Sequence, residues 1–269
     1  AQVESAILLS SLNTPGKTDI NCIKSRDHTE LMLKKSLRLP IKIKKQKNTE
    51  KIEIYGKKNF YSFDYDIPGD ISSAAFFIVL TILSKNSKLL IKNVNLNKTR
   101  SGIVDIIRRM RGNIKILNRT IYKGEYRGDI LVKSTNYLKS INCPKNLNTK
   151  SIDEFLIIFL IAAKAKGVST FKNLEELNKK ESPRLKWGSK ILKMMGVKVI
   201  TKNNSIKIFG NPNLKVNKKI EIQKYLKDHR VFMTSVIAAL SFGGEWHIHD
   251  KDSIKTSFPS FLKLINTFR

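Results

Sequence analysis

Residues 153–163 read Asp-Glu-Phe-Leu-Ile-Ile-Phe-Leu-Ile-Ala-Ala, an acidic pair followed by an unbroken apolar run. A helix that is apolar on every side has to be buried on every side. The run is nevertheless too short for a membrane helix, which needs about 20 apolar residues. We therefore predict a helix in the centre of a protein core, with two carboxylates at its beginning.

Three other segments resemble this one, and the four together form an internal repeat. The others begin at Gln2, Asp70 and Asp228, so that the four starts lie 68, 83 and 75 residues apart. A period above about 50 residues is too long for a solenoid, and each unit should be a small α/β module. Asp begins three of the four segments, which predicts helix N-caps, because its carboxylate can accept hydrogen bonds from first-turn N–H groups.

A second, more amphipathic helix is expected in each unit, after a short strand. Its start is indicated by Ser or Thr before Pro or a charged residue, at residues 25–27, 99–101, 182–184 and 257–259. Two further strands then complete a unit that runs helix, strand, helix, strand, strand. Pro68 and Gly69 mark the best candidate for a hinge or domain boundary.

The composition fits a folded chain with a strongly basic surface. Its 269 residues are 41 % apolar, enough for one large domain or two smaller ones and too apolar for a disordered chain. The net charge of +29 would suit binding to a polyanion. The excess is mostly Lys spread along the whole chain, which favours an ordinary solvated surface. Even the densest run, residues 34–58, contains the alternation expected of half-buried strands at 41–44 and 52–54.

Several classes of function find no support in the sequence. Cys22 and Cys143 are too few for a disulfide scaffold or a cysteine metal site, and a cytoplasmic location is expected. No signal peptide, Gly-rich phosphate loop, serine-hydrolase motif or metal-ligand cluster is visible. His247 and His249 would share one strand face, where a surface pair is expected rather than a metal site. Because the first residue is Ala and not Met, we expect a fragment or a processed chain.

Charged residues gather where helices are expected to begin. Arg184 and Arg230 are notable, because a cation in the first turn of a helix opposes the helix dipole. If the units stack in parallel, their helix starts converge, and with Arg26 and Lys180 these arginines would form an anion site.

Two carboxylates, Asp153 and Glu181, would then lie among cations that can tune their proton affinity for acid–base chemistry. A structural alternative is that Asp153 and Asp228 only cap helices, that Glu181 adds favourable first-turn charge, and that the arginines are solvated.

Eight short motifs, in order along the full chain, resemble the 3-phosphoshikimate 1-carboxyvinyltransferase (5-enolpyruvylshikimate-3-phosphate synthase) family. Residues 25–30, Ser-Arg-Asp-His-Thr-Glu, are most similar to the bacterial class II form. The other motifs are residues 1–3, 69–76, 97–102, 152–155, 175–182, 228–230 and 256–259.

This resemblance implies an α/β fold of two inside-out barrel domains, each built of three repeated βαβαββ units. Residues 1–66 would be the last unit of an incomplete first domain, and residues 67–269 the three units of the second. Family members transfer the enolpyruvyl group of phosphoenolpyruvate to the 5-hydroxyl of shikimate 3-phosphate and release phosphate, without a metal or other cofactor. The reaction belongs to the route to chorismate and aromatic amino acids. Since the family's N-terminal substrate-binding motifs are absent, this chain alone is expected to be inactive.

The resemblance also implies a role for individual residues. Asp153 corresponds to the proton acceptor for the 5-hydroxyl, and Glu181 to the carboxylate that handles the methylene proton of phosphoenolpyruvate. The substrate-binding residues would be Arg184 and Arg230 for the phosphoenolpyruvate carboxylate, and Gln2, Ser25, Arg26 and Lys180 for shikimate 3-phosphate. The implied partners are these two substrates, with neither nucleic acid nor membrane, and a monomer at full length.

Two alternatives remain open. The related UDP-N-acetylglucosamine 1-carboxyvinyltransferase shares the fold and the phosphoenolpyruvate chemistry, although residues 25–28 and 180–182 favour the shikimate enzyme. The other is a basic module that binds RNA or DNA without catalysis. It is disfavoured because the aromatic residues are not clustered on strands, where they could stack on bases.

Overall fold

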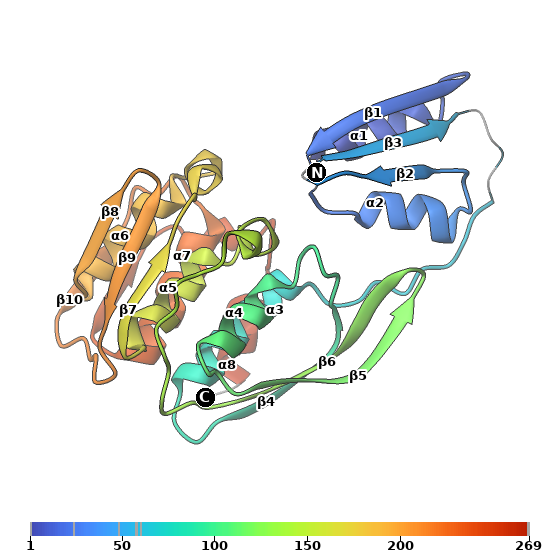
Figure 1. Ribbon diagram of the computed structural model, residues 1–269. Helices are drawn as coiled ribbons and strands as arrows, with labels where there is room; N and C mark the ends of the chain where they lie inside the picture. The colour runs from blue at the N-terminus through green and yellow to red at the C-terminus, as the bar shows by residue number, and fades with distance from the viewer. Residues whose placement is uncertain (1, 24, 48, 57–58, 60, 268–269) are drawn as a thin grey trace.

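The computed structural model describes residues 2–23, 25–47, 49–56, 59 and 61–267, and it is a mixed α/β structure with four small sheets. Figure 1 shows two bodies, joined by a stretch that includes residues 61–68 and has no regular secondary structure. Ala1, which begins the motif of residues 1–3, and Lys58, which ends the basic run of residues 34–58, lie outside the described residues.

The first body is one α/β unit around a three-stranded sheet. Strand β3 lies between β1 and β2 and is antiparallel to both. Its alternate residues Ile52 and Ile54 are fully buried, which confirms the strand predicted there. The elements are α1 (Gln2–Ser11), β1 (Lys17–Ile23), α2 (His28–Leu31) continued by a π-helical turn (Met32–Ser36), β2 (Lys42–Lys45) and β3 (Thr49–Tyr55).

The second body contains the other three repeats. The first two have antiparallel sheets of order β4–β6–β5 and β7–β9–β8, and in the third β10 pairs in parallel with β11. The elements are α3 (Ile71–Leu83), β4 (Lys88–Asn95), α4 (Gly102–Arg109), β5 (Ile114–Tyr122), β6 (Glu125–Lys133), α5 (Phe155–Lys164), β7 (Gly167–Phe171), α6 (Arg184–Met194), β8 (Val199–Lys202), β9 (Ser205–Gly210), β10 (Lys219–Ile222), α7 (His229–Phe242), β11 (Glu245–Ile248) and α8 (Phe261–Thr267).

The apolar helices are at the centre of this body, and the sheets lie outside them (Figure 1). Helices α3, α5 and α7 contact one another in every pairing. All residues of α5 from Phe155 to Ala163 are buried, and Phe155 and Phe159 pack on Phe171 of β7 with ring centroids 5.8 and 5.3 Å apart. This confirms the burial expected for helices that are apolar on every side, and it agrees with the inside-out fold implied by the family resemblance.

Two of the three predicted Asp caps are present. Asp70 accepts hydrogen bonds from the backbone N–H groups of Ser72 and Ser73, and Asp228 accepts one from Arg230. The cap predicted at Asp153 is wrong: α5 begins two residues later, and Glu154 precedes it without a side-chain cap. Asp153 lies in a turn before the helix, where side-chain cations engage its carboxylate in place of backbone N–H groups.

Each body has its own core. One hydrophobic cluster spans residues 8–54 and the other spans residues 71–265. The boundary between residues 66 and 67 stays a prediction. Among the described residues, no helix combines the length and the apolar character that crossing a membrane requires.

We expect Gly188→Ala to destabilise the second body. A Cβ at Gly188 in α6 would lie 2.7 Å from the ring of Phe159 and 3.2 Å from the side chain of Leu156, both in α5. Ala in place of Gly normally stabilises a helix by about 1 kcal/mol, but overpacking a core costs about 1–3 kcal/mol and should outweigh that gain. Urea unfolding measures the difference in the free energy of unfolding between Gly188→Ala and the parent protein. The exposed Lys186→Ala on the same helix is the control, and a more stable Gly188→Ala would contradict tight α5–α6 packing.

Candidate active site

Four cationic side chains surround the carboxylate of Asp153. Arg26 contacts Oδ2, and Nη1 of Arg100 lies 3.0 Å from the same oxygen. On the other oxygen, Oδ1, Nζ of Lys180 lies at 3.3 Å and Nη1 of Arg184 at 3.5 Å. The Asp153 side chain is 11 % exposed, so these pairs are screened only weakly by water.

A fifth cation binds the backbone of the same segment. Arg230 donates a hydrogen bond from Nη1 to the carbonyl oxygen of Asp153 at 2.9 Å, and the same nitrogen lies 3.8 Å from Oε1 of Glu154. The cations come from the segments that precede or begin α2, α4, α6 and α7. The prediction that the helix starts converge, with Arg184 and Arg230 beside Asp153, is therefore confirmed.

Arg184 is held by a buried ion pair. Its side chain is 1 % exposed, and its Nε donates to Oδ2 of Asp228 at 2.9 Å while Ser182 donates to the same oxygen at 2.8 Å. Burial by itself raises the pKa of Asp228, but the hydrogen bond and charge of Arg184 outweigh it and hold that pKa below its usual range. The alternative of a solvated Arg184 is therefore wrong, since Asp228 and Asp153 compensate its charge inside the protein.

The neighbouring carboxylates Asp153 and Glu154 are shifted in opposite directions. Burial by itself raises the pKa of Asp153, but Arg230, Lys180 and Arg26 hold it well below its ordinary value. Burial raises the pKa of Glu154, and there the nearby cations do not overcome it. Adjacent carboxyl groups with separated proton affinities are typical of sites that perform acid–base chemistry.

The remaining predicted residues lie at the edge of this cluster. Gln2 and Arg26 line a common cavity of about 370 Å³. Ser25 donates a hydrogen bond to Oε2 of Glu4 at 3.0 Å and does not reach Asp153 in any described contact. Glu181 contacts Arg184 with a side chain that is 54 % exposed, so it is accessible to a ligand.

Three residues beyond those predicted complete the site. Arg100 donates from Nη2 to Ser72 Oγ at 2.6 Å, and the Ser72 hydroxyl in turn contacts Oε1 of Glu154. This chain of contacts ties the beginning of α3 to the Asp153 segment. Arg100 shows the same signal as Arg184, a cation at a helix start, and that signal could have identified it.

Polar contacts from the first body also reach this region. His28 Nδ1 lies 2.5 Å from Oε1 of Glu125, and Asn97 donates to that oxygen at 2.7 Å and to Oδ1 of Asp27 at 2.8 Å. Burial by itself raises the pKa of Glu125, but hydrogen bonds from His28 and Asn97 lower it to about 2. With Arg26 on Asp153, these contacts place both bodies at one site.

In the part of the chain that the structure describes, no three or more His, Cys, Asp or Glu residues form a group that could hold a metal ion. His247 pairs with Glu245 at 2.7 Å, and His249 with Glu221 at 3.1 Å. The prediction of surface histidines is confirmed by their exposure and carboxylate partners.

Comparison with known proteins identifies the family. The sequence profile of EPSP synthase (3-phosphoshikimate 1-carboxyvinyltransferase) matches residues 1–265. The chain belongs to the EPSP synthase family. It is 41 % identical over 266 residues to the 3-phosphoshikimate 1-carboxyvinyltransferase of Thermodesulfovibrio yellowstonii, covering 98 % of this chain and 60 % of that protein. The protein of the same name from Petrotoga mobilis is 38 % identical over 270 residues, covering 100 % and 61 %.

Solved structures agree with this assignment. The EPSP synthase of Acinetobacter baumannii superposes with a TM-score of 0.87 at 33 % identity, covering 99 % of this chain and 60 % of that one. The enolpyruvyl transferase NikO of Streptomyces tendae shares the fold, with a TM-score of 0.67 at 13 % identity over 97 % of this chain and 57 % of that one. The chain thus spans about 60 % of the length of the EPSP synthase relatives that it matches.

The opposite pKa shifts of Asp153 and Glu154 give opposite pH dependences of stability. The folded pKa of Asp153 lies below its ordinary value of 3.8, so its stabilisation is complete above that pH and is lost as the pH falls. The folded pKa of Glu154 lies above 4.5, so its contribution is complete below that pH and is lost as the pH rises through the folded pKa.

We expect Asp153→Asn to lower the free energy of unfolding at pH 7 by about 3 kcal/mol, because it leaves several partly buried cations without their carboxylate. It should also flatten the loss of stability below pH 4. Glu154→Gln should cost less than Asp153→Asn at pH 7, because burial disfavours the charged form of Glu154 whereas the cations favour that of Asp153. Urea unfolding between pH 3 and pH 7 tests both, with exposed Asp64→Asn as control. Equal losses for the two variants would contradict the assignment.

Proposed function

We propose that this chain contributes to the transfer of the enolpyruvyl group from phosphoenolpyruvate to the 5-hydroxyl of shikimate 3-phosphate, with release of phosphate. The observation that carries the proposal is the set of cations around Asp153, on the fold of the EPSP synthase family. Both substrates are anions with phosphate groups, and guanidinium groups bind such oxygens with two parallel hydrogen bonds. The division of residues 1–66 and 67–269 between two family domains is part of this proposal.

In this proposal the more exposed cations, Arg26 and Lys180, bind shikimate 3-phosphate. The more buried ones, Arg184 and Arg230, bind phosphoenolpyruvate. The side chains of Arg26 and Lys180 are 30 % and 29 % exposed, so they can exchange part of their contact with Asp153 for a ligand phosphate or hydroxyl. Gln2 and Ser25 lie on the same side of the site, in the first body. Arg184 is held by Asp228, so a substrate carboxylate would have to displace the exposed Glu181 from Nη2 of Arg184 in order to bind it.

Arg230 would complete the grip on the phosphoenolpyruvate carboxylate, because its guanidinium already lies against the Asp153 segment. Glu181 would handle the methylene proton, since its carboxylate is exposed beside Arg184.

Substrate charge would convert Asp153 into a stronger base. The surrounding cations hold the pKa of Asp153 well below its ordinary value, which weakens this carboxylate as a base for a hydroxyl proton. Bound phosphate and carboxylate groups would neutralise part of the field of Arg26, Lys180 and Arg230 and raise that pKa. Asp153 would therefore become an effective proton acceptor for the 5-hydroxyl only when the substrates are present.

Calorimetric titration tests the substrate class. We expect binding of shikimate 3-phosphate in preference to UDP-N-acetylglucosamine, and a loss of at least tenfold in affinity for Arg26→Gln and Lys180→Gln, because each removes one charged contact. Exposed Arg108→Gln in α4 removes the same charge at a distance from Asp153 and should change the affinity by less than twofold. Preference for the UDP-sugar would contradict the proposal and favour the related transferase.

A second measurement follows the proton affinity of Asp153 directly. We expect shikimate 3-phosphate to raise the pKa of Asp153 by one unit or more, because its anionic groups offset the cations that lower it. The carboxyl carbon resonance of Asp153, assigned with the Asp153→Asn variant, reports this pKa during a pH titration with and without the ligand. An unchanged titration in the presence of saturating ligand would refute the proposed activation.

A further inference from the structure

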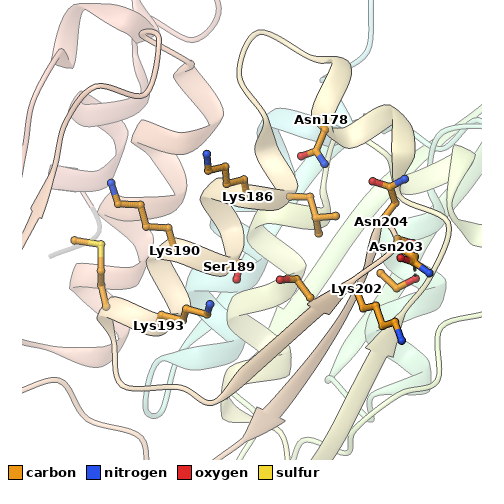
Figure 2. A pocket seen from close by; sticks show the side chains of 12 residues that line it. Asn178, Lys186, Ser189, Lys190, Lys193, Lys202, Asn203 and Asn204 are labelled. Atoms are coloured by element: carbon orange, nitrogen blue, oxygen red, sulfur yellow. Dashed lines mark hydrogen bonds between the residues drawn. The ribbon is translucent and has the colours of Figure 1, made fainter.

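A second cavity lies away from Asp153, between helix α6 and the β8–β9 hairpin. Its volume is about 700 Å³, within the usual range for small-molecule sites. Figure 2 shows the side chains that line it, from α6 on one side and from the strand end and turn on the other. None of the lining residues is among the described contacts of Asp153.

The rim of this cavity is cationic. Lys186, Lys190 and Lys193 follow one face of α6 at intervals of four and three residues, and Lys202 lies across from them at the end of β8 (Figure 2). Like charges at this helical spacing repel and cost a few tenths of a kcal/mol per pair. No acidic residue lines the cavity to offset that repulsion.

These four lysines also have no carboxylate partner elsewhere in the described part of the chain. None of them forms an ion pair there, whereas Lys180, just before the same helix, pairs with Asp153 at 3.3 Å. Some exposed lysines elsewhere are paired, as Lys255 is with Asp252 at 3.1 Å, but the chain has 51 Lys and Arg against 22 Asp and Glu, so the distinctive feature of these four is that they surround one cavity. The cavity therefore gathers four lysines without a carboxylate in its lining, and one of them, Lys190, has its Nζ over the ring of Trp187, 4.4 Å from the centroid.

The remaining lining suits an organic group as well as an anion. The apolar lining of the cavity includes the buried Leu185 and the partly buried Met194. The amides of Asn178, Asn203 and Asn204 lie at the other end (Figure 2). Asn203 and Asn204 both have positive φ, 47° and 55°, which is typical of a type I′ turn and fixes the direction of the hairpin tip.

We propose that this cavity binds an organic anion with two or more phosphate groups, of the nucleoside triphosphate class. Lys186 and Lys193 begin about 10 Å apart along the helix axis, so one phosphate cannot reach all of the cations, whereas a chain of phosphates can. The apolar surface of Leu185 and Met194 accepts the organic part, and the asparagine amides can donate to and accept from its polar edge. The site is separate from the proposed substrate site, although both involve helix α6.

Titration with ATP in 0.15 M salt, followed by calorimetry, tests this inference. We expect saturable binding that weakens at least tenfold in the variant K186Q/K193Q/K202Q. The control K88Q/K115Q/K133Q removes the same number of charges from exposed positions on the β4–β6–β5 sheet and should change the affinity by less than twofold. Equal weakening in both variants would show attraction to the net charge alone and would overturn the proposal.

Further probes separate this site from the one at Asp153. Arg26→Gln should leave ATP binding unchanged. If this variant lost ATP binding, the nucleotide would be placed at the proposed substrate site instead. AMP should bind at least tenfold more weakly than ATP, because it has a single phosphate. Inorganic triphosphate should also bind more weakly than ATP. Equal binding of triphosphate would refute the role of the apolar surface, and the absence of saturable ATP binding would refute the site, whatever the result with shikimate 3-phosphate.

Discussion

The Asp153 carboxylate lies where the beginnings of several helices converge. It binds cationic side chains from those helix starts, where a positive charge opposes the helix dipole. Arg184 shows the consequence most clearly. Its guanidinium is buried in the first turn of α6, where the electrostatic potential of the helix is positive. The charge of Arg184 therefore has to be compensated by Asp153 and Asp228. The position of α6 relative to α5 and α7 thus depends on these carboxylates as well as on apolar packing.

Residues adjacent in sequence acquire different chemistry because they face different surroundings. Asp153 faces the cations and keeps one edge towards solvent, whereas Glu154 is fully enclosed and meets the hydroxyl of Ser72. Cation charge dominates at the first carboxyl group and desolvation dominates at the second. The strand and helix scaffold separates the two proton affinities without any metal ligand cluster in the described residues.

The buried helices could be predicted because runs such as residues 155–163 contain no polar face, whatever their neighbours. The convergence of Arg184 and Arg230 could also be predicted, because each is unfavourable at the start of an isolated helix. The cap at Asp153 was predicted wrongly, since local sequence does not show that side-chain cations from distant segments bind it. The contact of Arg100 with Ser72 depends on how α3 and α4 pack, which sequence spacing does not determine.

Arg26 belongs to the first body and contacts Asp153 in the second, so it bridges the two bodies directly. A ligand that binds Arg26 has to replace this contact or share it. In the proposed function, shikimate 3-phosphate would share it, because it offers an anionic group to the guanidinium and a hydroxyl to the carboxylate. His28 and Asp27 meanwhile hold the same segment to Glu125 and Asn97. In that proposal the ligand would enter between Arg26 and Asp153 while the neighbouring polar contacts still join the two bodies.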